Sequence, residues 1–244
     1  MEQQSAVSLD VVALRFGADD PTVTFGVAPR RWDPFAGALA LPGVLLGRGE
    51  RLDAAARRAV HDKLGIPHEE IRAAGQLVTF DEPHRDPRGP TLSIAMWAVL
   101  GESCGASGPG GAGGTESSAG GTESEEAAET GESGSKATDL GLRWVAFDDV
   151  PALAFDHNMI VGAARTRLAE MLWKDIAFTR ALLGDRFPAT RAVALGTALT
   201  GARPDPGNLN RTLAALPGLT RTGERTRVKA TGRPAAIWAF ASDT

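Results

Sequence analysis

The chain has 244 residues, of which 43% are hydrophobic and 23% charged, and its formal net charge is −4. This length suits one large domain or two modest ones. The single cysteine, Cys104, excludes an internal disulfide framework and fits a reducing cytoplasm. The first residues lack the basic and apolar regions of a signal peptide, and no apolar run reaches the ~18 residues of a membrane span. We therefore expect a cytoplasmic protein with no membrane partner.

Two strands are predicted at the start, from Val7 to Phe16 and from Thr22 to Val27, joined by a Gly- and Pro-bounded turn. Arg30 and Arg31 follow the second strand. Their guanidinium groups could bind a phosphate, whose oxygens match the fork of N–H donors, or they could simply be a solvated strand end. A third strand is predicted from Ala38 to Leu41.

The stretch from Leu41 to Ile66 combines an apolar strand end, a Gly-rich loop, an acid at Glu50 and a helix from Leu52 to Leu64. Gly65 ends the helix. Apolar side chains recur every fourth residue and predict its buried stripe. These are Leu52, Ala56, Val60 and Leu64.

Strands are also predicted from Gln76 to Phe80 and from Thr91 to Leu100. The polar loop between them carries Arg85 and Arg88. It could be a solvated hairpin, or it could carry recognition groups, as loops on a rigid scaffold often do.

Residues 102–139 consist almost entirely of Gly, Ser, Ala, Thr and Glu, with eight acids against Lys136, a net charge of −7. A segment with so few large apolar side chains cannot offset the entropy of ordering, so we expect a disordered insertion. The strand from Leu142 to Phe147 then resumes the first domain. A helix is predicted from Asn158 to Trp173, with Asp156 as its N-cap and His157 in a packing or capping role.

The charge balance reverses from Ile176 onward, where the chain has ten cations and four acids and the net charge is +6. A small basic segment beside a more acidic one suggests a polyanionic partner. Predicted helices lie at 176–183, 189–199 and 206–216, the last capped by Asp205, and a β-hairpin follows with strands at 219–222, 227–230 and 235–240.

This order of helices and hairpin predicts a small α+β winged helix-turn-helix domain that binds double-stranded DNA. Its third helix would enter the major groove with Asn208, Asn210 and Arg211 near base edges, because Asn pairs with adenine and Arg with guanine. The hairpin cations would meet phosphates or reach into a minor groove. These cations are Arg221, Arg225, Arg227, Lys229 and Arg233. The alternative is a solvated helix followed by a charged hairpin.

The stretch from Leu41 to Ile66 resembles the Nudix box, G-x5-E-x7-R-E-U-x-E-E-x-G-U, where U is apolar. Glu50, Arg58 and Gly65 keep its frame, but the first glycine is Val44, and the three helix glutamates are replaced. Ala59, Asp62 and Lys63 stand in their places. Divalent cations need several carboxylates on one helix face, so the box has lost its metal-holding chemistry. We expect no catalytic residue, metal or cofactor.

The chain as a whole resembles the Nudix-related transcriptional regulators of the NrtR family. The resemblance rests on the box, on residues 77–95, on LAFDHNMIV at 153–161, and on DPGNLNRTL and GRPAAIWAF near the end. It implies an α/β Nudix fold, a mixed sheet sandwiched by helices, over residues 1–174, and a DNA-binding domain over residues 175–244.

The resemblance also implies a homodimeric regulator, a repressor of NAD-metabolism genes, that binds ADP-ribose or a related nucleotide and an operator. We expect the effector to contact five residues of the first domain, which are Arg31, Glu50, Arg58, Arg85 and Arg88. Two alternatives stay open. One is a pyrophosphatase acting on ADP-ribose through Glu50 and Asp62, and the other is a sugar-responsive regulator of the same architecture.

Overall fold

A computed structural model of the chain describes residues 5–17, 21–101, 141–226 and 234–241. Cys104, the acidic segment 102–139 and the predicted strand 227–230 lie outside these ranges. The elements of the N-terminal part are β1 (Ala6–Phe16), β2 (Val23–Pro29), β3 (Leu39–Ala40), β4 (Gly43–Leu45), α1 (Leu52–Leu64), a short 3-10 helix (His68–Glu70), β5 (Ile71–Phe80), β6 (Thr91–Leu100), β7 (Arg143–Ala146) and α2 (His157–Met171). Among the described helices, none combines the length and hydropathy that crossing a bilayer requires.

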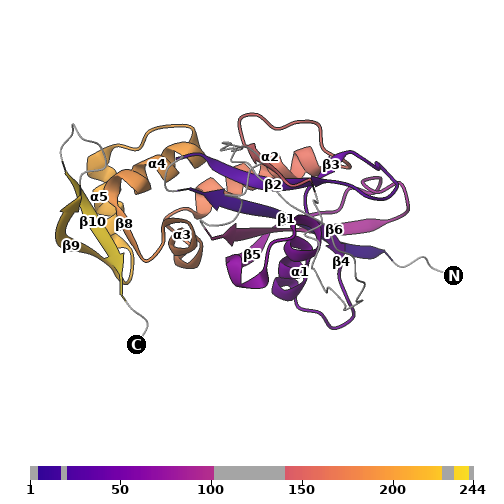
Figure 1. The fold of residues 1–244 in the computed structure, drawn as a ribbon, viewed down its shortest axis with the longest axis horizontal. Helices are drawn as coiled ribbons and strands as arrows, with labels where there is room; N and C mark the ends of the chain where they lie inside the picture. Colours follow the sequence, from indigo (N-terminus) through magenta and orange to yellow (C-terminus); the bar gives the residue numbers. More distant parts are fainter. Residues whose placement is uncertain (1–4, 18–20, 102–140, 227–233, 242–244) are drawn as a thin grey trace, which may run out of the picture.

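The N-terminal part is built on a mixed sheet with strand order β3-β2-β1-β6-β5, to which β4 is added beside β1 and β7 beside β2. β1 and β6 run parallel, and every other pairing in this sheet is antiparallel. Figure 1 shows the sheet running through the middle of this part, with the helices around it. The expected α/β fold with a mixed sheet is confirmed.

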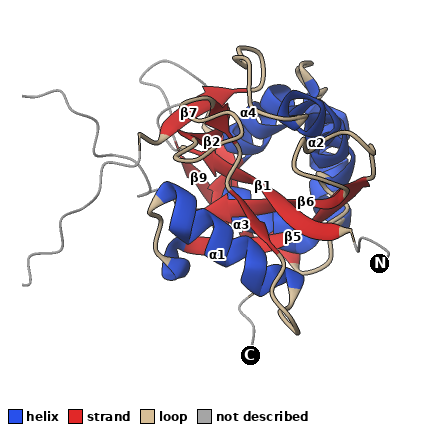
Figure 2. Cartoon of the chain, turned by 90° about the vertical axis from the view of Figure 1, so that its right-hand side faces the viewer, coloured by secondary structure: helices blue, strands red, loops and turns tan. Residues whose placement is uncertain are grey.

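β1 is buried on both faces, and its alternate side chains enter two different cores because successive residues of a strand point to opposite sides. Leu9, Val11 and Ala13 pack with Ala56 and Val60 of α1. On the other side, Val12, Leu14 and Phe16 join the core of α2. Figure 2 shows α1 and α2 on opposite sides of the strands. The predicted stripe of α1 is confirmed at Ala56, Val60 and Leu64, while Leu52 is only partly buried.

The C-terminal part forms the end of the molecule farthest from the N-terminus (Figure 1). It consists of α3 (Ile176–Leu183), β8 (Arg186–Pro188), α4 (Ala189–Thr200), α5 (Pro206–Ala215), β9 (Leu219–Thr226) and β10 (Ala235–Phe240). The strands form an antiparallel sheet in the order β8-β10-β9. Asp205 caps α5 as predicted, its carboxylate accepting a hydrogen bond from the Asn208 N–H at 2.8 Å.

Two kinds of contact join the C-terminal part to the large sheet. α3 packs against β5 and β6, where the Phe178 ring meets the Trp97 ring edge-on at 5.1 Å between centroids. Arg191 of α4 reaches the end of β1, donating to the Phe16 carbonyl at 3.1 Å and the Gly17 carbonyl at 3.2 Å. The end of β1 is therefore tied to α4 by charged hydrogen bonds.

Several local predictions differ from the structure. β5 begins at Ile71 rather than Gln76, β9 continues to Thr226 rather than ending at Thr222, and β8 was not predicted. The strand expected from Ala38 to Leu41 is present only as the shorter β3, and the unpredicted β4 follows Pro42, which lacks an N–H and cannot continue the ladder. Asp156 occupies the N-cap position of α2 but makes no side-chain capping bond, because its carboxylate binds Arg85 instead.

Candidate functional site

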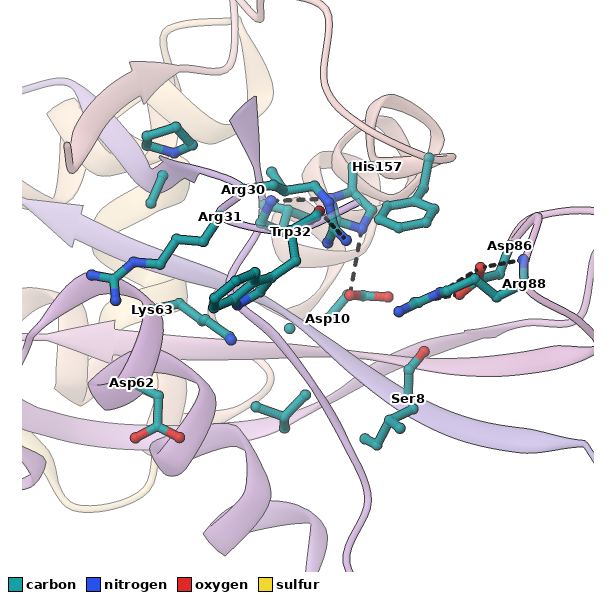
Figure 3. Close-up of a pocket in the computed structure, with 18 of the residues that line it drawn as sticks. Ser8, Asp10, Arg30, Arg31, Trp32, Asp62, Lys63, Asp86, Arg88 and His157 are labelled. Atoms are coloured by element: carbon teal, nitrogen blue, oxygen red, sulfur yellow. Dashed lines mark hydrogen bonds and ion pairs between the residues drawn. The ribbon is translucent and has the colours of Figure 1, made fainter. Parts of the chain in front are cut away.

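A cleft of about 540 Å³ opens between the loop after β2, the start of β4, the last turns of α1 and the β5–β6 loop. Its wall is strongly charged (Figure 3). The cations that line it are Arg30, Arg31, Arg58, Lys63, Arg85 and Arg88, and the carboxylates are Asp10, Asp33, Asp62 and Asp86.

The floor of the cleft is a buried ion cluster centred on Arg85. Its guanidinium donates to the Asp156 carboxylate through Nε at 2.9 Å and Nη2 at 2.7 Å, and Nη2 also lies 3.1 Å from Asp10 Oδ2. All three side chains are less than 10% exposed. Arg85 was expected to contact a ligand, yet its donors are already committed, so it holds the cleft floor together.

His157 and Ser93 complete the cluster around Asp10. The Leu41 N–H donates to His157 Nδ1 at 3.0 Å, so Nδ1 carries no proton, and Nε2–H faces Asp10 Oδ1 at 3.4 Å. The Ser93 hydroxyl donates to Asp10 Oδ2 at 2.5 Å. A catalytic triad would need the histidine between the serine and the acid. Here the acid is in the middle, so the expected packing role of His157 agrees with the geometry.

The Asp10 carboxylate contributes to the free energy of unfolding in a way that depends on pH, because its pKa is lowered in the folded chain. Burial raises this pKa, but hydrogen bonds from His157 and Ser93 and the charge of Arg85 outweigh burial and lower it from 3.8 to about 2. The unfolded chain therefore binds the proton more readily than the folded one. The ionised carboxylate contributes about 2 kcal/mol of stability above about pH 4, and this is lost as pH falls toward about 2.

We expect the free energy of unfolding in urea to fall over that interval, and Asp10→Asn to remove this part of the fall because it has no proton to gain. The control is the same titration of Asp53→Asn, whose side chain is 58% exposed on α1. Identical pH dependence in the wild type and Asp10→Asn would contradict the assignment.

Gly43 is required by the same cluster. β4 pairs with β1 so that Gly43 lies opposite Asp10, and a Cβ at Gly43 would come within 2.5 Å of Asp10 Oδ1. Real Cβ atoms do not approach so closely, and the carboxylate is held by its partners and cannot move aside. The Gly in the Leu-Pro-Gly sequence therefore keeps space for the cleft floor.

Aromatic side chains form the mouth of the cleft. Trp32 lines it and is 75% exposed. Phe155 packs edge-on against Phe35 at 4.8 Å, and the Arg30 guanidinium stacks on the Phe155 ring at 4.5 Å. Phe35 and Phe155 have φ angles of 65° and 56°, a conformation that bulky residues rarely adopt and that often marks functional sites. An exposed indole beside cations suits a planar, anionic ligand.

The six cations of the cleft differ in how far they are neutralised. Arg58 is paired with Glu50, and Arg88 is paired with Asp86 at 2.7 Å, as Arg85 is with its two acids. Among the described residues, no carboxylate pairs with Arg31 or Lys63. Burial and the charge of Arg88 lower the pKa of Arg30, as expected where positive charge accumulates. Of the four arginines expected to contact the effector, Arg58, Arg85 and Arg88 are paired with acids, and only Arg31 is without an acidic partner in the described chain.

Glu50 and Arg58 form a clasp within the box loop. Glu50 Oε1 accepts from Arg58 Nε at 2.9 Å, and Oε2 accepts from Arg58 Nη2 and the Gly47 N–H, both at 2.8 Å. The Arg58 and Gly47 bonds lower the pKa of Glu50 to about 2. Arg58 lines the cleft, whereas Glu50 is not among the lining residues. The clasp shapes the loop between β4 and α1.

The box positions do not suit a divalent metal. Ala59 is buried against the sheet, and Asp62 and Lys63 both line the cleft. Both carboxylate oxygens of Glu50 already accept hydrogen bonds from Arg58. Within the described ranges, no group of three or more His, Cys, Asp or Glu side chains is placed to hold a metal ion. Mg²⁺ is normally held by hard oxygen ligands, mostly carboxylates and water, and these box positions do not offer such a set.

The C-terminal part presents a second polar surface, on α5. Leu209 and Leu213 are buried, whereas Asn208, Asn210 and Arg211 are exposed. Arg211 donates to the Asn208 side-chain oxygen at 2.5 Å, so these two residues lie together on the outer face. Asn210 instead donates to the Pro206 carbonyl at 2.8 Å and turns back along the helix.

Arg221 and Arg225 are exposed on β9, the strand that packs against α5. Arg227, Lys229 and Arg233 lie outside the described residues. Arg211, predicted to contact a base, therefore lies on α5, and the predicted phosphate contacts Arg221 and Arg225 lie on the neighbouring strand β9.

Several cleft residues were missed from the sequence. Asp10 could have been noticed, because a lone acid inside the apolar strand Val7–Phe16 requires a buried partner. Trp32 and Phe155 carry no comparable signal. Their place at the cleft mouth depends on loops from distant parts of the chain.

Comparisons with known proteins identify solved structures that share this architecture. No protein-family model matches the sequence, and no curated protein matches it. Among solved structures, the crystal structure of Shewanella oneidensis NrtR is similar with a TM-score of 0.68 and 21% identity over 96% of this chain and 93% of that one. The same protein complexed with a 27mer DNA gives a TM-score of 0.67 at 19% identity over the same shares, 96% and 93%.

A third similar structure is a MutT/nudix family protein from Enterococcus faecalis, with a TM-score of 0.64 and 20% identity over 98% of this chain and 89% of that one. These likenesses extend across both parts of the chain rather than the large sheet alone. The chain therefore has an NrtR-like fold along nearly its whole described length.

Proposed function

We propose that the chain is a transcriptional regulator whose C-terminal part binds double-stranded DNA and whose N-terminal cleft binds ADP-ribose or a related nucleotide. The NrtR of Shewanella oneidensis has been crystallised with a 27mer DNA, and its fold covers both parts of this chain. By the same likeness we propose a homodimeric repressor of NAD-metabolism genes. Two copies would read the two half-sites of a palindromic operator.

The observation that carries the proposal is the arrangement of α4, α5 and the β9–β10 hairpin. Two helices joined by a short turn, followed by an antiparallel hairpin packed on the second helix, have the order and contacts of a winged helix-turn-helix. In that arrangement α5 is the recognition helix. Its exposed face carries Asn208 and Arg211, whose side chains match base edges in the major groove.

The cleft supports the second half of the proposal. Arg30, Arg31 and Lys63 line it without an acidic partner in the described chain, and Trp32 offers an exposed planar surface at its mouth. A nucleotide combines an anionic phosphate with a flat ring. The volume of about 540 Å³ lies within the usual range of small-molecule sites.

β1 offers a physical connection between the two halves. Asp10, near its middle, belongs to the cleft floor, and the carbonyl groups at its end accept hydrogen bonds from Arg191 of α4. A ligand shifts a conformational equilibrium only by its differential affinity for the two states. We propose that the bound nucleotide favours a placement of α4 and α5 in which the two copies no longer fit the operator.

A fluorescence anisotropy titration tests the DNA half of the proposal. The full chain is mixed at moderate salt with a labelled duplex from upstream of its own gene, and with a scrambled duplex of the same composition. We expect binding to the upstream duplex to be about a thousandfold tighter. Addition of ADP-ribose should release it.

Equal affinity for the two duplexes would contradict the DNA-binding half. Release by sugar phosphates but not by ADP-ribose would reassign the effector to a sugar. Release of product from ADP-ribose in the presence of Mg²⁺ or Mn²⁺, lost in Glu50→Gln, would favour the pyrophosphatase instead.

A further inference from the structure

Lys63 occupies one of the three box positions where a glutamate would help to hold a metal ion. α1 keeps the length and frame of the box helix, so this position still faces the cleft. In Figure 3 the Lys63 side chain extends beneath Trp32, and the Asp62 carboxylate points away from the Lys63 ammonium group. A cation therefore stands where the fold elsewhere places a metal ligand.

The Lys63 ammonium has no acidic partner among the described residues, unlike the guanidinium groups of Arg58, Arg85 and Arg88. Three of its neighbours in the cleft wall, Arg30, Arg31 and Trp32, approach from the loop after β2. An exposed ammonium with three N–H donors and no carboxylate to neutralise it binds phosphate as a point charge.

We propose that Lys63 replaces the metal ion of the fold, so that the cleft binds the diphosphate of its ligand directly and without a divalent cation. This inference rests on the proposed nucleotide-binding role of the cleft, and it adds the form in which the ligand is bound. The ammonium supplies positive charge to the phosphate oxygens from α1, and Arg31 supplies it from the loop after β2. A bound Mg²⁺ would be repelled by the ammonium, and no group of three or more His, Cys, Asp or Glu side chains in the described chain is placed to hold it.

Isothermal titration of the full chain with ADP-ribose tests this directly, once in EDTA and once in Mg²⁺. We expect the same affinity in both buffers. Lys63→Met keeps the length of the side chain but removes its charge, and it should weaken binding by about 10- to 100-fold because a hydrogen bond to a charged group is lost. Lys63→Arg should retain most of the affinity.

Lys63→Glu restores the box acid, and its remaining affinity should be higher in Mg²⁺ than in EDTA. The matched control is Lys174→Met, which removes an exposed lysine between α2 and α3 and should bind as the wild type does. A requirement for Mg²⁺ in the wild type, or unchanged binding by Lys63→Met, would overturn the proposal.

Inorganic pyrophosphate is the second probe, and it separates this inference from the proposed function. Binding of pyrophosphate in EDTA that is lost in Lys63→Met, without binding of ADP-ribose, would support the role of Lys63 while contradicting the proposed effector. Binding of neither compound would contradict both.

Discussion

Replacing Arg85 by methionine should destabilise the fold by about 3–5 kcal/mol, because it leaves two carboxylates buried without a cation. The Arg85 side chain is 4% exposed, and its partners Asp10 and Asp156 are 8% and 9% exposed. Asp10 would keep only His157 and Ser93 as partners, and Asp156 would lose both of its charged hydrogen bonds. Urea unfolding followed by circular dichroism measures the loss.

Arg88→Met is the matched control for this experiment. Arg88 lies in the same loop and also forms an ion pair, with Asp86, but its side chain is 58% exposed. Asp86 is only 8% exposed, but its carboxylate keeps the hydrogen bond from the Arg88 backbone N–H at 3.0 Å when the Arg88 side chain is removed. The control should therefore lose only about 1 kcal/mol, less than Arg85→Met does. Equal stability of Arg85→Met and Arg88→Met would show that the cluster does not hold the cleft floor. If Arg85→Met yields no folded protein, Arg85→Lys, which keeps the charge but loses the double contact, should be intermediate.

Arg211→Ala should weaken binding to the operator by about 1–3 kcal/mol, which is about 5- to 150-fold in Kd. The loss should be confined to the specific duplex, because a base contact contributes nothing on scrambled DNA. Anisotropy titrations on both duplexes measure this difference. Discrimination between the duplexes should therefore fall along with affinity.

Arg221→Ala provides the contrast on the neighbouring strand. As a phosphate contact it should weaken binding to both duplexes by a similar factor and reduce the salt dependence. Arg51→Ala, an exposed charge at the start of α1, should change neither affinity. Equal losses on both duplexes for Arg211→Ala would assign Arg211 to the phosphate backbone instead of a base.

The helices were predicted closely because each carries local signals for its beginning and end. The helix expected from Leu52 to Leu64 begins and ends at those residues, and Gly65 has the left-handed φ of 70° that a helix end favours. The last helix begins at Pro206 after the Asp205 cap. β4 was missed because a strand of three residues beside Pro42 has no periodicity to detect.

The roles of individual side chains followed the sequence less well. Arg31, Arg85 and Arg88 all lie in polar loops, where the sequence predicts exposed arginines, and all three line the cleft. They differ only in which acids lie within reach. Asp10 comes from a strand 75 residues before Arg85, and Asp156 from a helix start 71 residues after it. Asp156 was likewise predicted as a helix cap, because capping is an interaction between near neighbours in the sequence. Its actual partner, Arg85, is 71 residues away.

The sequence by itself determined the order of the helices, the loss of metal-holding acids from the box helix and the gathering of positive charge in the last third of the chain. These are properties of composition and of spacing within one element. Only the tertiary structure decided which cations of the cleft are neutralised, that Trp32 stands at its mouth, and that Arg191 ties α4 to the end of β1. The reason is that charge pairing and burial depend on distances between segments far apart in the chain, and the packing of both faces of the sheet sets those distances.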